Sequence, residues 1–362
     1  MIASFEDDND AYEKWLRTQC DVVKADLAHK HERMTESAFF FLRATYFRWA
    51  RTIEEVCPEC ADAPKIAAVG DIHIENYGVW RDREGRLVWG INDYDEAARA
   101  PYAYDLVRLA ASAMLTPDLS LADAEIANAI LVGYDRGLAN PGPVLLDRDN
   151  VWMRQLVQCT EENRAKFWIE VDAYKRVKAP TEAREALVSD LPNRAEIVRF
   201  VKRRKGGGSL GKPRFAVIAN WRGGALLREA KAVTGSAWNW AHGKGRKETM
   251  LMDLARSPSR APDPFLDVRG GYLVRRLAPD SRKIEFDDRQ RYEMTDLRVL
   301  SMMGQDLASA HAARKPAAIE TDFKRRHGAW LEVAARNAVK AVEADYKAWC
   351  DLYRQANPEP AK

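Results

Sequence analysis

The sequence predicts an α+β protein of two lobes, in which a small antiparallel β lobe interrupts a larger, mainly helical lobe. A chain of 362 residues is long enough for two domains or for one large two-lobed domain. Apolar residues recur at helical spacing in the first and last parts of the chain, whereas strand-like runs and glycine-rich turns begin near Ile197. We therefore expect the helical lobe in residues 1–194 and 286–362, and the β lobe in residues 195–285.

The composition is that of an ordinary soluble globular protein, with 46% hydrophobic and 31% charged residues. The net charge of +3 is too small to indicate a nucleic-acid-binding protein. No apolar run reaches the roughly 18 residues of a membrane span, and the acidic segment 1–8 lacks the layout of a signal peptide. Five cysteines, an odd number, argue against a disulfide framework. We expect a cytoplasmic protein that partners neither membranes nor nucleic acids.

The helical first part leads into an unusually apolar segment. Residues 37–47, S-A-F-F-F-L-R-A-T-Y-F, are expected to form a buried element, with Arg43 either paired with a carboxylate or reaching a ligand. Cys57 and Cys60 then form a lone C-x-x-C motif, without the second pair of ligands that a zinc site needs. Because Pro64 follows closely, we interpret the motif as a turn before a strand.

Polar side chains follow two predicted strands. Residues 65–69 have the composition of a buried strand, and Asp71 and Asn76 come directly after it in the segment G-D-I-H-I-E-N. Residues 87–91 form the second strand, which precedes Asp93 and Asp95. If both strands end at the same edge, these side chains lie close together. Packing alone gives little reason to concentrate such groups, because each one costs free energy when it is buried without a partner.

A glycine-rich turn follows three predicted helical segments, residues 104–115, 121–134 and 152–191. The turn, residues 206–211, stands before two strand-like runs, 215–219 and 225–231, and Lys231 ends the second run. Backbone N–H groups of such a turn can lie over phosphates, and a lysine on a neighbouring strand can reach them. The pattern alone is weak, because glycine-rich hairpin turns are common. The basic run 202–205 has no aromatic platform beside it, which disfavours RNA binding.

Three further elements complete the predicted fold. Residues 271–277 form another strand, and residues 294–311 and 323–352 have the apolar spacing of helices.

Together these segments supply a candidate for each group that phosphoryl transfer from ATP needs. The reaction requires a carboxylate that accepts a proton, an amide and a second carboxylate that hold Mg²⁺, a glycine-rich cover and a lysine on the phosphates. Asp71 and Asn76 have the D-x-x-x-x-N spacing of the first two groups. Asp93, the turn 206–211 and Lys231 supply the others. We therefore expect ATP and Mg²⁺ as cofactors and a phosphotransferase activity.

The motifs also carry a family resemblance. Residues 70–76, 91–95 and 104–106 resemble the G-D-x-H-x-x-N, I-D-F and D-L-A motifs of aminoglycoside-phosphotransferase-type kinases. The chain more closely resembles the uncharacterised bacterial family called domain of unknown function 2252, which is grouped with the protein-kinase-like fold. This resemblance runs over most of the chain, through the segments 34–43, 108–112, 207–211, Lys231 with Ser236, 274–276 and 307–312.

The resemblance implies a role for each matching residue. Asp71 would be the catalytic base, Asn76 and Asp93 the metal ligands, and Lys231 the phosphate-binding lysine. Asp95 would be an additional metal ligand, and Asp105 would be the buried carboxylate that braces the catalytic loop. The remaining nucleotide-binding positions would be Gly206, Gly207, Gly208, Ser209, Gly211 and Glu248, the last of these as the helix glutamate that pairs with Lys231. Two positions depart from the kinase pattern: Val69 replaces a histidine, and Pro213 replaces a valine.

The order of the motifs along the chain is a larger departure from the kinase pattern. In ordinary kinases the glycine-rich loop and the lysine precede the catalytic loop, whereas here Asp71 and Asp93 come before both. The helix that ends at His311 resembles the one that normally leads into the catalytic loop, yet it lies far downstream. We therefore expect a circularly permuted kinase-like fold, with the catalytic and metal loops in 1–194, the nucleotide-binding lobe in 195–285 and the helical remainder in 286–362.

Two other functions stay open. G-D-I-H also resembles the opening motif of metallophosphoesterases, but such a site needs several more histidines, and the other five stand in no suitable context. We expect His73 to be a hydrogen-bonding group of the loop. A pseudokinase that binds nucleotide without catalysis is the second alternative. The acceptor, a small molecule or a protein, and the choice between phosphate and AMP transfer are open.

Overall fold

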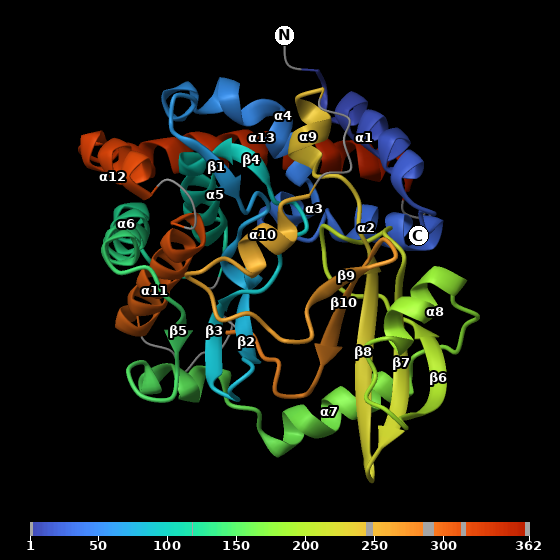
Figure 1. Cartoon of the computed structure of the whole chain (residues 1–362). Helices are drawn as coiled ribbons and strands as arrows, with labels where there is room; N and C mark the ends of the chain where they lie inside the picture. The colour runs from blue at the N-terminus through green and yellow to red at the C-terminus, as the bar shows by residue number, and fades with distance from the viewer. Residues whose placement is uncertain (1–2, 118, 244–248, 285–292, 313–315, 359–362) are drawn as a thin grey trace.

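The computed structural model describes residues 3–117, 119–243, 249–284, 293–312 and 316–358, and it has a mixed α+β architecture (Figure 1). Its α-helices are α1 (Phe5–Gln19), α2 (Lys24–Arg33), α3 (Ala38–Ala44), α4 (Tyr46–Val56), α5 (Tyr102–Met114), α6 (Asp123–Ala139), α7 (Glu161–Asp172), α8 (Thr181–Val188), α9 (Ala237–Ala241), α10 (Leu251–Ala255), α11 (Glu293–His311), α12 (Pro316–Arg325) and α13 (Trp330–Ala356). Its 3₁₀ helices are η1 (Pro58–Cys60), η2 (Ile74–Asn76) and η3 (Val151–Val157).

The strands alternate with these helices along the chain. They are β1 (Lys65–Ala68), β2 (Tyr77–Arg81), β3 (Leu87–Ile91), β4 (Ala98–Pro101), β5 (Val144–Leu145), β6 (Glu196–Lys202), β7 (Arg214–Trp221), β8 (Gly224–Ala232), β9 (Asp267–Arg269) and β10 (Tyr272–Leu277). All of their pairings are antiparallel. The α+β class and the antiparallel sheet predicted from the sequence are therefore confirmed.

Several helices begin at residues that can cap them. Ser4 accepts a hydrogen bond from the Asp7 N–H at 3.1 Å at the start of α1, and Ser37 accepts one from the Phe40 N–H at 3.1 Å at the start of α3. Such caps satisfy backbone donors that have no partner within the helix. Cys57 and Cys60 are both buried and free, and η1 ends at Cys60 shortly before β1. The interpretation of this motif as a turn before a strand is therefore confirmed.

The largest sheet has the strand order β6-β7-β8-β10-β9 and occupies the right-hand side of Figure 1. Its two faces are covered by different helices. Ala216, Ile218 and Leu227 pack against Val171 of α7. Their neighbours on the opposite face include Val217, which packs with Leu187 of α8. Alternate residues of a strand point to opposite faces, so α7 and α8 sandwich this sheet.

The sheet lies within residues 195–285, the range predicted for the β lobe. Both covering helices precede residue 195 in the chain, so the packing unit around the sheet begins earlier than the sheet itself. The division of the chain into lobes at residues 194 and 285 stays a prediction.

The largest hydrophobic core joins the remaining helices with two small sheets, β1-β4 and β2-β3-β5. In this part of the molecule α11 packs along α6, and α13 packs along α5. The apolar segment predicted to be buried contributes Phe39, Phe40, Phe41 and Phe47 to this core. Burial of such side chains contributes about 1.5–3 kcal/mol each, so this segment anchors the helical part.

The first and last helices of the chain lie side by side. The rings of Phe5 in α1 and Trp349 in α13 have centroids 5.7 Å apart. Arg48 of α4 joins the same helices, because it bonds Asp8 at 2.5 Å and Asp345 at 2.8 Å. The first and last helices therefore meet in one region of the fold (Figure 1).

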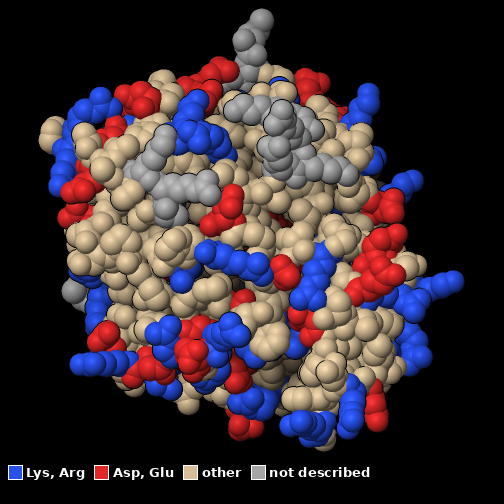
Figure 2. All heavy atoms as spheres, viewed as in Figure 1, with Lys and Arg blue, Asp and Glu red and all other residues tan. Residues whose placement is uncertain are grey.

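The surface mixes charges of both signs. Over the described residues of the face shown in Figure 2, Lys and Arg side chains are interspersed with Asp and Glu, without the single-sign stripe that marks many nucleic-acid-binding surfaces. In the part of the chain that is described, no helix combines the length and the apolar character needed to cross a bilayer.

Candidate functional site

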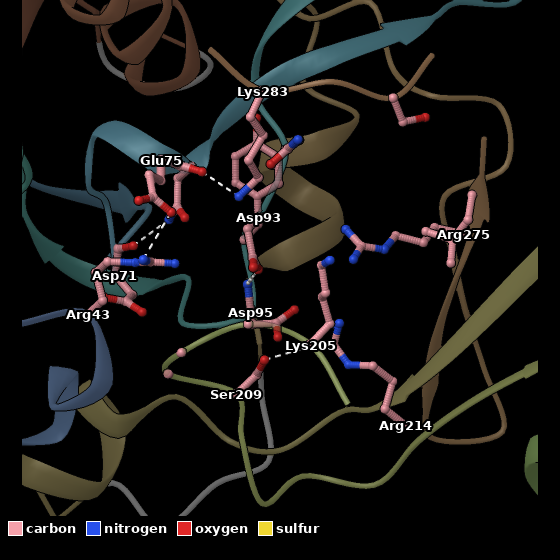
Figure 3. Close-up of a pocket in the computed structure, with 18 of the residues that line it drawn as sticks. Arg43, Asp71, Glu75, Asp93, Asp95, Lys205, Ser209, Arg214, Arg275 and Lys283 are labelled. Atoms are coloured by element: carbon pink, nitrogen blue, oxygen red, sulfur yellow. Dashed lines mark hydrogen bonds and ion pairs between the residues drawn. The ribbon is translucent and has the colours of Figure 1, made fainter. Parts of the chain in front are cut away.

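A cavity of about 880 Å³ lies between the five-stranded sheet and the helical part of the molecule (Figure 3). It brings together segments that are more than one hundred residues apart in the sequence. Among the residues predicted to form the site, those that line this cavity are Asp71, Asn76, Asp93, Asp95, Gly206, Gly207, Gly208 and Ser209. Lys231 is not among the lining residues but pairs with two of the lining carboxylates, Asp93 and Asp95. Gly211 is also not among the lining residues.

The loop between β1 and β2, residues 69–76, positions Asp71, and we call it the Asp71 loop. Gly70 begins the turn with a φ of 84°, and a Cβ atom there would lie 2.5 Å from the Glu96 carbonyl oxygen. Both the positive φ and the close approach require glycine. The backbone N–H groups of Val69 and Gly70 donate to the Asp105 carboxylate at 2.6 and 3.0 Å. Asp105 therefore lies where the sequence resemblance expected a bracing carboxylate.

Asp105 belongs to a buried hydrogen-bonded chain. Its Oδ2 atom is 2.9 Å from His311 Nε2, and His311 Nδ1 is 2.8 Å from the Tyr134 hydroxyl. His311 ends α11, so this chain ties the end of α11 and the middle of α6 to the start of the Asp71 loop. Satisfied polar networks of this kind fix a unique local arrangement.

The Asp71 carboxylate itself is held by Arg108 of α5, which donates a short hydrogen bond to Oδ1. Arg108 is completely buried, donates to the Leu42 carbonyl at 2.8 Å and lies over the Tyr46 ring at 5.0 Å. Burial raises the pKa of Asp71 to about 7, even though the Arg108 guanidinium acts in the opposite direction. A carboxyl group with this pKa is balanced between its two protonation states near neutral pH.

The remaining polar groups of the Asp71 loop have partners. The Asn76 side-chain amide N–H donates to the Asp71 carbonyl, which leaves the amide oxygen available to a ligand. His73 accepts a hydrogen bond from the Glu75 N–H at 3.2 Å, and burial together with Arg43 lowers its pKa well below the usual range. Arg43 pairs with Glu75 at 2.9 Å. His73 is thus a neutral hydrogen-bonding group, and Arg43 is paired with a carboxylate, as the sequence suggested.

The second acidic segment, residues 92–96, follows β3 and carries Asp93 and Asp95; we call it the Asp93 loop. Its base is braced by Asp306 of α11, whose carboxylate accepts the Ile91 N–H at 2.8 Å. Arg260 binds the same carboxylate at 2.5 Å and donates to the Ile91 carbonyl at 3.1 Å. A buried aspartate therefore supports each acidic loop, Asp105 under the first and Asp306 under the second.

Lys231 of β8 joins the sheet to the Asp93 loop. Its ammonium group forms a close ion pair with Asp95, and Nζ lies 3.7 Å from Asp93 Oδ1. Although burial acts in the opposite direction, Lys231 and Arg275 hold the pKa of Asp93 well below its ordinary value. Lys231 and Asp93 therefore face one another across the same cleft. Glu248, the partner that the sequence suggested for Lys231, lies outside the described residues.

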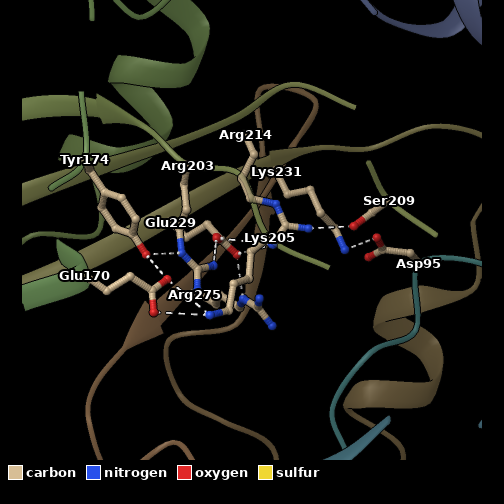
Figure 4. A network of polar contacts seen from close by, with 10 residues as sticks. All are labelled: Asp95, Glu170, Tyr174, Arg203, Lys205, Ser209, Arg214, Glu229, Lys231 and Arg275. Atoms are coloured by element: carbon tan, nitrogen blue, oxygen red, sulfur yellow. Dashed lines mark hydrogen bonds and ion pairs between the residues drawn. The ribbon is translucent and has the colours of Figure 1, made fainter. Parts of the chain in front are cut away.

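A second charged network lies on the sheet beside Lys231 (Figure 4). Glu229, 1% exposed, is surrounded by three arginines: it forms close ion pairs with Arg203, with Arg275 at 2.8 Å and with Arg214 at 3.3 Å. The three guanidinium groups outnumber the carboxylate, so this wall of the cavity carries excess positive charge. Such a wall suits an anionic ligand.

The turn between β6 and β7, residues 206–211, closes the cavity over Asp71, and we call it the glycine turn. Arg214 donates to the Ser209 hydroxyl at 2.7 Å and so ties this turn to the Glu229 network. A Cβ atom on Gly208 would lie 2.6 Å from the Arg43 carbonyl oxygen and 3.1 Å from Asp71 Oδ2. Only glycine lets the turn approach the Asp71 carboxylate this closely.

The oxygen atoms at the site match the preference of Mg²⁺. The described residues contain no group of three or more His, Cys, Asp or Glu side chains arranged to hold a metal ion. The site instead offers two carboxylates and an amide oxygen, from Asp93, Asp95 and Asn76. The Lys231 ammonium contacts both carboxylates, so this corner already binds a cationic group. Mg²⁺ typically takes one or two carboxylates and completes its shell with water and phosphate oxygens.

Sequence reasoning missed the charged partners that hold these residues in place. Arg108, Asp306 and Glu229 contact the site only because the chain folds back on itself. A weak signal existed for two of them. Arg108 is the only basic residue in the apolar stretch Tyr102–Met114, and Glu229 stands in a strand two residues before Lys231, on the same face.

Of the comparisons with known proteins, a match to one protein family covers part of the chain. No curated protein and no solved structure matches it. A match to a family model extends over residues 22–136, about a third of the chain, whereas the sequence resemblance was expected over most of it. The matched region contains Asp71, Asn76, Asp93, Asp105 and Arg108, but neither the glycine turn nor Lys231. Over residues 22–136 the chain is thus similar to the family described as an uncharacterized protein conserved in bacteria (DUF2252).

Proposed function

We propose that this protein is an ATP- and Mg²⁺-dependent phosphotransferase with a permuted kinase-like fold. The observation that carries the proposal is the meeting of Asp71, Asp93 and Lys231 at one cavity. Phosphoryl transfer needs a carboxylate that can accept a proton, a metal site and cationic groups that bind the phosphates. The cavity offers a carboxylate whose pKa lies near neutral pH, a corner that suits a metal ion, and a cationic wall under the glycine turn.

Each residue has a role that follows from its position. The glycine turn and Lys231 bind the phosphates of ATP, and the Glu229 network keeps the surrounding wall cationic. Asp71 takes the proton from an acceptor hydroxyl while the acceptor oxygen forms its bond to the γ-phosphorus and the bond to the β-phosphate oxygen breaks. Arg108 positions the Asp71 carboxylate. ADP and the phosphorylated acceptor are the products.

Asn76, Asp93 and Asp95 would hold the metal ion. When bound, Mg²⁺ supplies charge neutralisation to the phosphate oxygens. Because Lys231 contacts both Asp93 and Asp95, its ammonium group must shift from these carboxylates toward the phosphates when the nucleotide binds. The Lys231–Asp95 ion pair therefore belongs to the ligand-free state of the proposed site.

A circular permutation of a kinase-like fold is supported by the position of α11. In the proposed ancestor this helix would run directly into the Asp71 loop. Here the two are separate in sequence, but His311 at the end of α11 contacts Asp105, which holds the first residues of that loop. The contact between α1 and α13 places the first and last helices where a linker could once have joined them.

Nucleotide binding without catalysis is the alternative with an observation in its favour. Arg108 already neutralises Asp71, and a carboxylate held in this way is a weaker base than a free one. The catalytic proposal is supported by the pKa of Asp71, which burial raises to about 7 although Arg108 acts in the opposite direction.

Calorimetric titration with Mg-ATP tests the proposal. We expect the wild-type protein to bind one nucleotide, and Asp93→Ala and Lys231→Ala each to weaken binding by about tenfold or more, since each loses a charged contact. Asp135→Ala, which removes an exposed carboxylate of α6 far from the cavity, serves as the matched control. Equal binding by the wild type, Asp93→Ala and Lys231→Ala would refute the site.

Catalysis is tested separately by ADP production from Mg-ATP across a set of hydroxyl-bearing acceptors. We expect Asp71→Ala to bind Mg-ATP normally and to lose turnover. Nucleotide binding without any ADP production by the wild type would favour the non-catalytic alternative.

A further inference from the structure

One buried cation at the cavity has no counter-ion among the described residues. Lys30 of α2 lines the cavity, and its side chain is 3% exposed. Within the described ranges of the chain, no carboxylate lies within salt-bridge distance of its ammonium group. The ring of Phe47 lies beside it, with its centroid 5.5 Å from Nζ. A buried ammonium group without a paired anion is costly.

The acidic side chains around Lys30 are already engaged. Those whose charge reaches it most strongly are Glu13, Asp71 and Glu96. Glu13 is 2.6 Å from His31 and 3.1 Å from Arg17.

The other two carboxylates also have cationic partners of their own. Asp71 is bound by Arg108, and Glu96 by Lys212 at 3.2 Å. None of the three is therefore available to Lys30, and burial lowers the pKa of Lys30 to about 8.

A second polar group lies beside it. Tyr12 of α1 lines the same cavity and is 5% exposed, and its hydroxyl makes no hydrogen bond with any described residue. The Tyr12 ring stacks on Phe47 with centroids 4.6 Å apart and an interplanar angle of 9°. Phe47 thus contacts both Tyr12 and Lys30, and two hydrogen-bond donors meet at one part of the cavity wall.

We propose that Lys30 and Tyr12 bind the anionic group, phosphate or carboxylate, of a small-molecule acceptor whose hydroxyl group reaches Asp71. This inference rests on the proposed phosphotransferase function. In the proposed site the nucleotide phosphates have their own cations, Lys231 and the arginines around Glu229, which belong to the sheet. Lys30 and Tyr12 belong instead to α2 and α1, and α2 packs against the glycine turn through the hydrogen bond from the Val23 N–H to the Gly211 carbonyl. Their near-complete burial favours a small molecule over a protein surface.

Titration with two simple anions tests the inference. The protein is first saturated with Mg²⁺ and β,γ-imido-ATP, which fills the proposed phosphate subsite, and is then titrated with inorganic phosphate or with succinate. We expect saturable binding of at least one anion, weakened by about tenfold or more in Lys30→Met and less in Tyr12→Phe, because a charge-assisted contact is stronger than a neutral one.

The controls separate this inference from the proposed function. Lys24→Met removes an exposed lysine from the same helix and should bind the anions like the wild type. Lys30→Met should keep the wild-type melting temperature and nucleotide affinity, whereas a purely structural Lys30 would lower the melting temperature. If β,γ-imido-ATP does not bind, the proposed function fails, and the anions can still be titrated into the free protein.

Three outcomes would overturn the inference. One is the absence of saturable anion binding in both the free and the nucleotide-bound protein. The second is equal anion affinity in the wild type and Lys30→Met. The third is anion binding that disappears when β,γ-imido-ATP is present and that depends on Lys231, which would place the anion in the nucleotide subsite.

Discussion

At the scale of single residues, the site is defined by charges that are buried together. Asp71 illustrates the balance: burial favours its neutral form, and the ion pair with Arg108 favours its charged form. The outcome is a pKa of about 7, which gives the carboxylate useful basicity at neutral pH. An exposed aspartate would be ionised at this pH but would be a poor proton acceptor.

The pH dependence of turnover follows from this balance. Because the base must be ionised to accept a proton, kcat/KM for ATP turnover should fall about tenfold for each pH unit below the pKa of Asp71, which is about 7, and reach a plateau above it. Initial rates between pH 5.5 and pH 9 measure the profile. Asp71→Glu should shift the midpoint, whereas Asp135→Asn should leave it in place. A profile that is flat from pH 5.5 to pH 8 would exclude Asp71 as the base.

The Glu229 network makes a prediction about stability. Glu229→Gln leaves three arginines beside one another without their shared carboxylate, and breaking a buried ion pair in this way costs about 3–5 kcal/mol. Chemical denaturation should show this loss in the free energy of unfolding, with Glu185→Gln on the exposed side of α8 as the control. Because the pKa of Glu229 is held well below its ordinary value, its stabilising contribution should be complete above pH 5 and decline in more acidic solution. A change below about 1 kcal/mol would show that the arginines are well solvated.

At the scale of elements, the glycine turn between β6 and β7 determines how closely the sheet approaches the Asp71 loop. Its contact with Asp71 and with the carbonyl of Arg43 is made by Gly208. Strands β7 and β8 carry the other sheet residues of the site, Arg214 and Lys231, which are paired in register. A shift of the turn therefore moves the phosphate-binding groups relative to the proposed base.

Gly208→Ala tests the closeness of this contact. The added methyl group would meet a backbone oxygen at 2.6 Å, so the turn must move away from Asp71. We expect turnover to fall about tenfold or more, since small misplacements of reacting groups are costly, while the melting temperature changes little. Gly224→Ala, in the β7–β8 hairpin, is the control, because the nearest atom to the new methyl group would be the Trp221 carbonyl oxygen at 4.0 Å. Wild-type turnover in Gly208→Ala would show that the turn does not approach the phosphates.

Sequence patterns predicted the elements of the fold well where periodicity and turns are strong. The strands that precede Asp71 and Asp93, the glycine turn and the helix ending at His311 all lie where expected. The covering of the sheet by α7 and α8 could not be predicted, because their charged sequences look like those of solvated helices. Their apolar residues are few, and the sheet that covers them lies later in the chain.

Within the candidate site, the residues to which we assign the chemistry stand out in the sequence, whereas their partners do not. Asp71, Asn76 and Asp93 stand out as polar groups after apolar strands. Arg108 and Lys30 are ordinary helix residues in the sequence, and their importance comes from contacts with distant segments. For the same reason the contacts of Lys231 with Asp93 and Asp95 could not be predicted, and its pairing with Glu248 stays a prediction.

At the scale of the whole molecule, the cavity lies where the sheet meets the helical part. The two acidic loops and the glycine turn meet there, and Asp26 of α2 adds ion pairs with Lys202 at 3.5 Å and with Arg204 at 2.9 Å. Because α1 packs against α13, the two could be joined by a linker and new ends opened elsewhere in the chain with little change to the fold. The circular permutation that we propose would change the order of the motifs along the chain and keep their arrangement in space.

Binding of Mg-ATP in this cavity should therefore stabilise both the sheet and the helical part against unfolding. Mg-ATP at about one hundred times its Kd would add about 2.7 kcal/mol to the free energy of unfolding and raise the melting temperature by about 4 °C. Differential scanning calorimetry with Mg-ATP, and with ATP plus EDTA, measures the shift. We expect EDTA to remove most of it, because Asp93 and Asp95 then repel the phosphates. The same shift with and without the metal would argue against the proposed metal site.

A crystal structure of the protein with Mg²⁺ and β,γ-imido-ATP is the most direct measurement of the proposed site. We expect the triphosphate to lie under residues 206–211 with Lys231 against it, the metal ion on Asp93 and the γ-phosphate facing Asp71. A nucleotide bound outside this cavity, or one whose phosphates contact neither Lys231 nor a metal ion on Asp93, would contradict the proposed phosphotransferase site.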